Sequence, residues 1–120
     1  MTHRSVQVIL KGQAKLEFEG LERIVGEQWA RGILNSPEQQ LLKSIKQARD
    51  MLKLNPNYGD SVPKEQIPIH MDVSNLFVVD LNRDWRMLYT LVGDQVEVLA
   101  FVLNIVDHPT YDKMFGYRKK

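Results

Sequence analysis

The spacing of apolar residues along the chain changes from a helical period to a strand period. Residues 5–10 (SVQVIL) are rich in β-branched side chains, which is typical of a strand. Two stretches with apolar residues at intervals of three or four follow, and this spacing places each set on one face of a helix. The two sets are Ala14, Phe18, Leu21, Val25 and Trp29, and then Leu41, Ile45, Ala48 and Leu52. We therefore expect one strand followed by two amphipathic helices.

The start and the end of the second helix have local signals. Ser36 can cap the helix, Pro37 suits its first turn, and Gln39 can close a capping box with Ser36. Asn55-Pro56 ends it, because proline disfavours helical geometry in the residue before it. Residues 55–73 then carry three prolines and read as a long loop with room for a short edge strand.

The last third of the chain reads as three strands separated by turn residues. The strands are predicted at residues 76–81, 85–91 and 96–106, and a final helical turn is predicted at 109–115, before Gly116. The third strand has apolar residues at both odd and even positions. A strand of this kind is central in its sheet and is covered, at least in part, on both faces.

This order of elements predicts an α+β fold. A strand–helix–helix unit precedes a three-stranded antiparallel meander, and the two helices pack on one face of a four-stranded sheet. With 120 residues the chain is expected to be a single domain, 1–120. A core of this size leaves no room for a deep enclosed cavity, so we expect any site to be a surface groove.

The composition excludes several kinds of site. There is no cysteine, which excludes disulfides, thiolate metal sites and cysteine nucleophiles, and fits a reducing compartment. His3 and His70 have no second ligand at a suitable spacing, and no glycine-rich phosphate loop is present, so we expect neither a metal nor a cofactor. No apolar segment is long enough for a signal sequence or a membrane span, which predicts a cytoplasmic protein without membrane contact.

The charge of the chain is nearly balanced. The formal net charge is +1, from 16 Lys and Arg against 15 Asp and Glu, whereas nucleic-acid binders usually have a basic excess. An RNA site would therefore need local clustering, and Lys113, Arg118, Lys119 and Lys120 at the end of the chain supply some. Such a tail also reads as a solvated terminus.

Arg86 is the first candidate for chemistry. On a strand, Trp85, Met87 and Tyr89 share one face and Arg86 lies on the other. A guanidinium on a rigid sheet can bind a phosphate through two hydrogen bonds. The alternative is a structural arginine that extends to water at the edge of the sheet or pairs with Asp80 or Asp84.

A second group of candidates follows the last strand. His108 titrates near neutrality and Tyr111 offers a phenol, so either could transfer protons. The alternative is that His108 caps the last helical turn and Tyr111 covers the core. Lys64 lies in the long loop, where an isolated lysine is usually solvated.

These residues occur in a familiar order. The segment NPNYGDSVPKEQIP (residues 55–68), the strand motif WRMLY and the ending DHPTYDKMFGY together resemble the RelE/ParE superfamily of type II toxin–antitoxin toxins. The resemblance covers residues 55–120 in detail, while the first half agrees in layout only. It implies the small α+β toxin fold, with helices packed on an antiparallel sheet.

For the RelE-like branch the resemblance implies an endoribonuclease that cleaves messenger RNA on the ribosome, with the 2′-hydroxyl attacking the neighbouring phosphodiester. The implied partners are a cognate antitoxin, the ribosome and mRNA, without a cofactor. Arg86 would contact the scissile phosphate, and His108 and Tyr111 would supply acid–base and stacking groups. The implied RNA contacts are Lys64, Arg83, Lys113, Tyr117 and Arg118.

Two other functions stay open at this point. The chain could be a ParE-like toxin that targets a protein, gyrase, or an inactive module with this fold that only binds a partner. The feature that separates them is whether Arg86, His108 and Tyr111 meet in one exposed groove.

Overall fold

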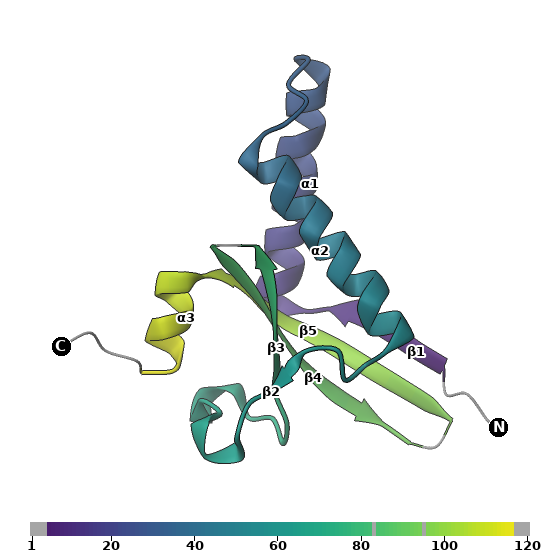
Figure 1. Cartoon of the computed structure of the whole chain (residues 1–120), viewed down its shortest axis with the longest axis vertical. Helices are drawn as coiled ribbons and strands as arrows, with labels where there is room; N and C mark the ends of the chain where they lie inside the picture. Colours follow the sequence, from purple (N-terminus) through teal and green to yellow (C-terminus); the bar gives the residue numbers. More distant parts are fainter. Residues whose placement is uncertain (1–4, 83, 95, 117–120) are drawn as a thin grey trace.

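The computed structural model describes residues 5–82, 84–94 and 96–116. Figure 1 shows a twisted sheet with a long helical hairpin on one face and a short helix, α3, at one end. None of the described helices is both long and apolar enough to cross a membrane. The elements are β1 (Ser5–Leu10), α1 (Gly12–Ala30), α2 (Pro37–Leu54), β2 (Asp60–Ser61), β3 (Phe77–Asn82), β4 (Trp85–Gly93), β5 (Glu97–Asp107) and α3 (His108–Met114).

The α+β fold expected from the sequence is confirmed, with one addition to the sheet. Its strand order is β1-β5-β4-β3-β2, so it has five strands and not four. The fifth strand, β2, has only two residues and pairs antiparallel with β3. β5 lies between β1, which runs parallel to it, and β4, which runs antiparallel. Its central place confirms the prediction made from its apolar residues.

The main core lies between the sheet and the α1–α2 hairpin. It contains the predicted stripe of α2 and that of α1 apart from Trp29, which is 63% exposed because the sheet does not extend beneath that part of the hairpin. The strands contribute Val79, Met87, Tyr89, Ala100, Val102 and Ile105. The capping box at the start of α2 is present. Ser36 Oγ accepts a hydrogen bond from the backbone N–H of Gln39, and Gln39 Oε1 accepts one from the backbone N–H of Ser36.

A second, smaller core covers part of the opposite face of the sheet. Leu76, Leu88, Val106 and Tyr111 are buried there, beneath α3 and the loop of residues 62–75. That loop includes two short 3₁₀ turns, Lys64–Gln66 and Ile69–Met71. The sheet is therefore covered on its two faces by different parts of the chain.

A side-chain amide extends the sheet where β1 ends. Leu10, the last residue of β1, pairs with Val102, so β5 continues beyond its parallel neighbour. Gln13 lies next to this unpaired stretch. Its Oε1 accepts a hydrogen bond from the backbone N–H of Ile105 at 2.7 Å, and its Nε2 donates one to the Ile105 carbonyl at 2.9 Å. Gln13 thus takes the place of a strand for Ile105, a residue with no exposed surface.

We predict that Gln13→Ala lowers the free energy of unfolding by about 1–2 kcal/mol, because it removes two hydrogen bonds to the backbone of a buried residue. Gln47→Ala is the matched control, since Gln47 is an exposed glutamine on α2 and the gain in helix propensity is the same. Urea denaturation of both variants measures the difference. Equal free energies of unfolding for the two variants would mean that water replaces the Gln13 amide at the Ile105 backbone without a loss of stability.

Candidate functional site

Arg86 lies on β4, on the face of the sheet that the helical hairpin does not cover. Its neighbours Met87 and Tyr89 belong to the main core, and Leu88 belongs to the second core. The alternation expected from the sequence is therefore confirmed for this strand. In the β3–β4 pairing Arg86 is directly opposite Asp80.

Two contacts hold the guanidinium group of Arg86. Its Nε lies 3.1 Å from Asp80 Oδ1, and its central carbon lies 4.4 Å from the centre of the Tyr111 ring. The first contact is an ion pair by distance only, because Nε has no hydrogen-bond partner among the described residues. The Asp80 side chain is 74% exposed, so this pair contributes little stability. The stacking on Tyr111 is the more effective constraint on Arg86.

Tyr111 forms the floor of the site. Its side chain is buried, and its ring stacks on Phe115 with 4.4 Å between ring centres. Arg86, Tyr111 and Phe115 thus form a stack that runs from the sheet into α3 and the residue that follows it. Tyr111 was a candidate from the sequence, whereas Phe115 was not, because its place depends on how α3 docks on the sheet.

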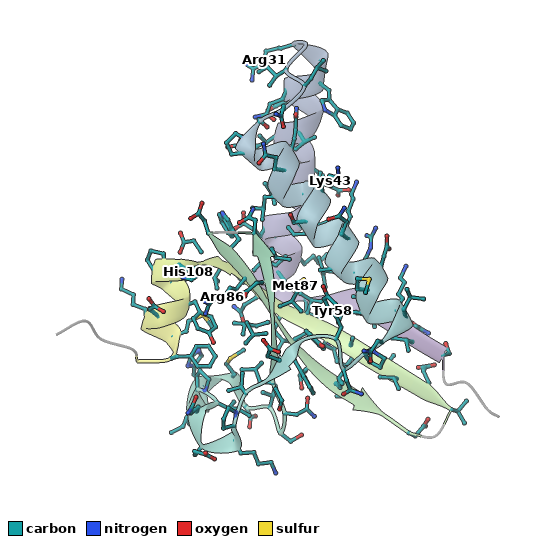
Figure 2. The ribbon with its side chains drawn as sticks, viewed as in Figure 1. Arg31, Lys43, Tyr58, Arg86, Met87 and His108 are labelled. Carbon is teal, nitrogen blue, oxygen red and sulfur yellow. The ribbon has the colours of Figure 1, made fainter. Side chains whose placement is uncertain are left out.

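An open hollow of about 230 Å³ lies beside this stack. Residues 60–63 form the opposite wall, and Asp80 and Arg86 lie on the sheet side. Figure 2 shows Arg86 on the sheet next to α3. The lining residues are Asp60, Ser61, Val62, Pro63, Gln66, Val78, Asp80, Arg86 and Tyr111. They include one guanidinium, two carboxylates and no lysine.

Tyr89 holds the wall of this hollow in place. Its hydroxyl donates a hydrogen bond to the Pro56 carbonyl at 2.7 Å and accepts one from the Gly59 backbone N–H at 2.9 Å. Burial raises the pKa of Tyr89, so the hydroxyl keeps its proton for the first of these bonds. A Cβ at Gly59 would come within 2.9 Å of both the Tyr89 ring and the Val78 carbonyl. Glycine is thus required where the chain enters β2.

The other candidate residues do not line the hollow. His108 is the first residue of α3 and is half-buried, with its backbone N–H bonded to the Asp84 carbonyl. Lys64 lines a separate hollow of about 310 Å³ within the loop of residues 64–74, and Lys113 is exposed on α3. Arg83, Tyr117 and Arg118 lie outside the described residues. The structure thus places Arg86 and Tyr111 in one hollow, and His108 is not among the residues that line it.

Asp60 and Ser61 were not predicted as site residues, because a two-residue strand has no detectable period in the sequence. The pairing of Arg86 with Asp80 was one of the alternatives weighed for Arg86, and the β3–β4 register, which shifts between Asp80 and Asn82, places the two residues opposite each other. Within the described part of the chain, no cluster of three metal-ligating side chains occurs.

The solved structures include one with the same fold. A YoeB/ParE toxin from Agrobacterium tumefaciens matches 85% of this chain and 98% of its own, with a TM-score of 0.58 and 12% sequence identity. The chain has the fold of a YoeB/ParE toxin. The resemblance to the RelE/ParE superfamily, predicted from the sequence, is thereby confirmed at the level of the fold. No protein-family model matches the sequence, and neither does any curated protein.

In this toxin fold, α3 carries Tyr111 to the site, and Asp107 anchors the start of α3. Asp107 Oδ1 accepts a hydrogen bond from the backbone N–H of Thr110 at 3.0 Å. Hydrogen bonds from the side chain and the backbone of Thr110 lower the pKa of Asp107. The ionised carboxylate therefore favours the folded state, in which α3 is docked.

We predict that the stability due to the Asp107 carboxylate is present above the pKa of an unfolded aspartate, about 4, and is lost as the pH falls through the lower folded pKa. Asp107→Asn keeps a capping oxygen but does not titrate. The excess stability of the wild type over this variant should shrink between about pH 5 and about pH 2. Urea denaturation across this range measures it, and a constant difference would contradict the prediction.

Proposed function

We propose that this chain is the toxin of a toxin–antitoxin pair and that it cleaves messenger RNA on the ribosome. The fold shared with a YoeB/ParE toxin supports the first part. The second part rests mainly on Arg86, whose guanidinium is held on a strand and on an aromatic ring at the edge of an open hollow. An arginine held in this way can bind a phosphate without first losing many conformations.

The reaction in this proposal is attack of a ribose 2′-hydroxyl on the adjacent phosphodiester. The phosphorane that forms carries extra negative charge, which Arg86 stabilises. A substrate phosphate would replace Asp80 as the partner of Arg86. This exchange is easy, because Asp80 is 74% exposed and its one close contact with Arg86 is not a hydrogen bond.

Proton transfer needs other groups. We keep His108 as a proton carrier, although it does not line the hollow, because histidine is the side chain most often used in general acid–base catalysis. Asp60 and Asp80 line the hollow and can accept a proton from the 2′-hydroxyl. The burial of Tyr111 beneath Arg86 favours a positioning role for its ring over proton transfer.

The partners in this proposal are an antitoxin that covers the hollow, the ribosome and mRNA, in the cytoplasm. Lys64 and Lys113 are proposed RNA contacts, as are Arg83, Tyr117 and Arg118 from outside the described residues. The net charge of only +1 implies weak non-specific attraction to RNA. Binding would depend on the shape of the ribosomal site.

A second candidate is a ParE-like toxin that targets a protein such as gyrase. The observation in its favour is the charge of the hollow, where two carboxylates accompany the single guanidinium. Such a surface suits a basic protein segment better than an RNA backbone.

The two candidates differ in which synthesis stops first. We predict that expression of the chain without an antitoxin lowers the incorporation of labelled methionine before it lowers that of labelled thymidine. Ribosome-bound mRNA should show new 5′ ends in primer extension. If thymidine incorporation falls first and the mRNA stays intact, the protein-targeting candidate is the correct one.

We predict that Arg86→Ala lowers the rate of mRNA cleavage by about 10²–10³-fold, the usual effect of removing one donor to the transition state. The fold should survive, because the Arg86 side chain lies at the margin of the second core and is 24% exposed. Arg23→Ala, which removes an exposed arginine from α1, is the matched control and should cleave normally.

Primer extension measures the cleavage, and thermal melting measures the fold. Tyr111→Phe keeps the stacked ring and should retain most of the activity, whereas His108→Ala should lose activity if His108 carries a proton. An Arg86→Ala protein that melts much earlier but stays as toxic per folded molecule would make Arg86 structural.

A further inference from the structure

The second cover of the sheet ends partway along β4. It still reaches Thr90, which is buried and whose hydroxyl oxygen lies 2.8 Å from the Asn75 carbonyl oxygen. Val92, two residues further along the same face of β4, is 54% exposed. Figure 1 shows α3 and the loop of residues 62–75 toward one end of the sheet, whereas β1 extends toward the other. The described residues thus leave this other end open on the face opposite the helical hairpin.

Apolar side chains of three neighbouring strands gather on this open face. Ile9 of β1 lies opposite Phe101 of β5, and Leu99 of β5 lies opposite Val92 of β4. Ile9, Leu99 and Phe101 are partly exposed. We call these four residues the open patch, and none of them belongs to either core. Exposed apolar side chains that gather in one place mark interaction sites.

Opposite charges flank the open patch. Lys11 keeps the extended backbone of β1, and its ammonium nitrogen lies 4.3 Å from the centre of the Phe101 ring, so it is on the same face. Glu97 begins β5 and shares the face of Leu99, two residues further on. Side chains on one face of a strand repeat in rows about 6.6 Å apart. Lys11 is one row beyond Ile9 and Phe101, and Glu97 is one row before Leu99. The two charges are therefore equally far from the centre of the patch.

We propose that the open patch packs against the same patch of a second copy of this chain. A two-fold axis between the two sheets, perpendicular to the strands, reverses the strand direction of one copy. The patches then stack face to face, and Lys11 of each copy lies beside Glu97 of the other. Because the contact is isologous, this ion pair occurs twice. The equal spacing of one positive and one negative charge about an apolar centre is the observation that favours a second copy.

A second copy fits the open patch better than RNA or a membrane surface does. One lysine and one glutamate flank the patch, whereas an RNA backbone or an anionic lipid surface attracts a series of cations. Arg86 is three rows from Val92 along β4, a distance of about 20 Å. The hollow beside Arg86 therefore stays outside this contact, and the inference is independent of the reaction proposed for Arg86.

The size of the open patch predicts a weak dimer. The patch and its flanking charges span three strands and four rows, or about 14 Å by about 20 Å. Each copy would then bury about 300 Å², whereas stable interfaces bury about 800 Å² per partner. We therefore expect a reversible dimer with a dissociation constant on the order of 100 μM.

Sedimentation equilibrium of the full chain between about 10 μM and about 1 mM measures this association. Lys11→Glu and Glu97→Lys should each weaken the dimer about tenfold, because either change places like charges beside each other twice. The double variant exchanges the two charges and should bring the dissociation constant back to within about threefold of the wild-type value. Lys11 and Glu97 of one copy are three rows apart, about 20 Å, so pairing within the chain does not explain such a recovery.

Lys46→Glu and Glu27→Lys are the matched controls, since both residues are exposed on the helical hairpin and the changes give the same net charges. They should leave the dissociation constant unchanged. Because the sequence contains no cysteine, Gln7→Cys, opposite Leu99 in the register, adds a single thiol. Stacked sheets lie about 10 Å apart, so a bismaleimide of about that length should link two copies of this variant. It should not link two copies of Gln47→Cys, whose thiol lies on α2.

Circular dichroism checks that every variant is folded. A wild-type chain that stays monomeric at about 1 mM overturns the proposal. So does a dimer that both charge reversals leave unchanged, or one that is linked through Gln47→Cys and not through Gln7→Cys. Binding of a single-stranded RNA of about 20 nucleotides that Lys11→Glu loses, by a chain that does not dimerise, would assign the open patch to RNA instead.

Discussion

Apolar residues on both faces of β5 are the constraint on which the rest of the structure depends. The α1–α2 hairpin covers one face and buries Ala100, Val102 and Ile105. The opposite face needs a second cover, which α3 and the loop of residues 62–75 provide around Leu88 and Val106. Because this second cover is small, it ends next to Arg86, and the hollow lies at its margin. The site is thus a consequence of how the second face is buried.

The same cover determines how firmly the site is held. Arg86 rests on Tyr111, Tyr111 stacks on Phe115, and both aromatic residues depend on the docking of α3. Asp107 starts α3 directly after β5, so the strand with the most pairing positions the helix that supports the arginine. On the other side of the hollow, the Tyr89 hydroxyl holds the chain as it enters β2. Both walls are therefore attached to the central strands.

The parts of this structure that follow from local signals were predictable from the sequence. Ser36, Pro37 and Gln39 placed the start of α2, and the alternation around Arg86 gave its face on β4. The parallel pairing of β1 with β5 was not predictable, because it joins residues about 90 positions apart. Nothing in the sequence of either strand indicates which other strand it pairs with. The burial of Tyr111 beneath Arg86 was also not predictable, since a short helix can dock on a sheet in several orientations. His108 was grouped with Arg86 by its sequence motif, yet it does not line the same hollow.

The charge of the hollow bears on how a substrate could be held there. With Asp60 and Asp80 beside Arg86, the hollow alone has little net attraction for a phosphate. Affinity for RNA would then have to come from another source, such as a ribosome that already holds the message. In that case weak binding in the hollow is no disadvantage, because only interactions that strengthen in the transition state accelerate the reaction. Asp80 would pair with Arg86 before the substrate arrives, and the single contact between them would be exchanged for two hydrogen bonds to the developing phosphorane. A near-neutral chain with one well-supported arginine is therefore compatible with RNA cleavage, provided that another molecule presents the RNA.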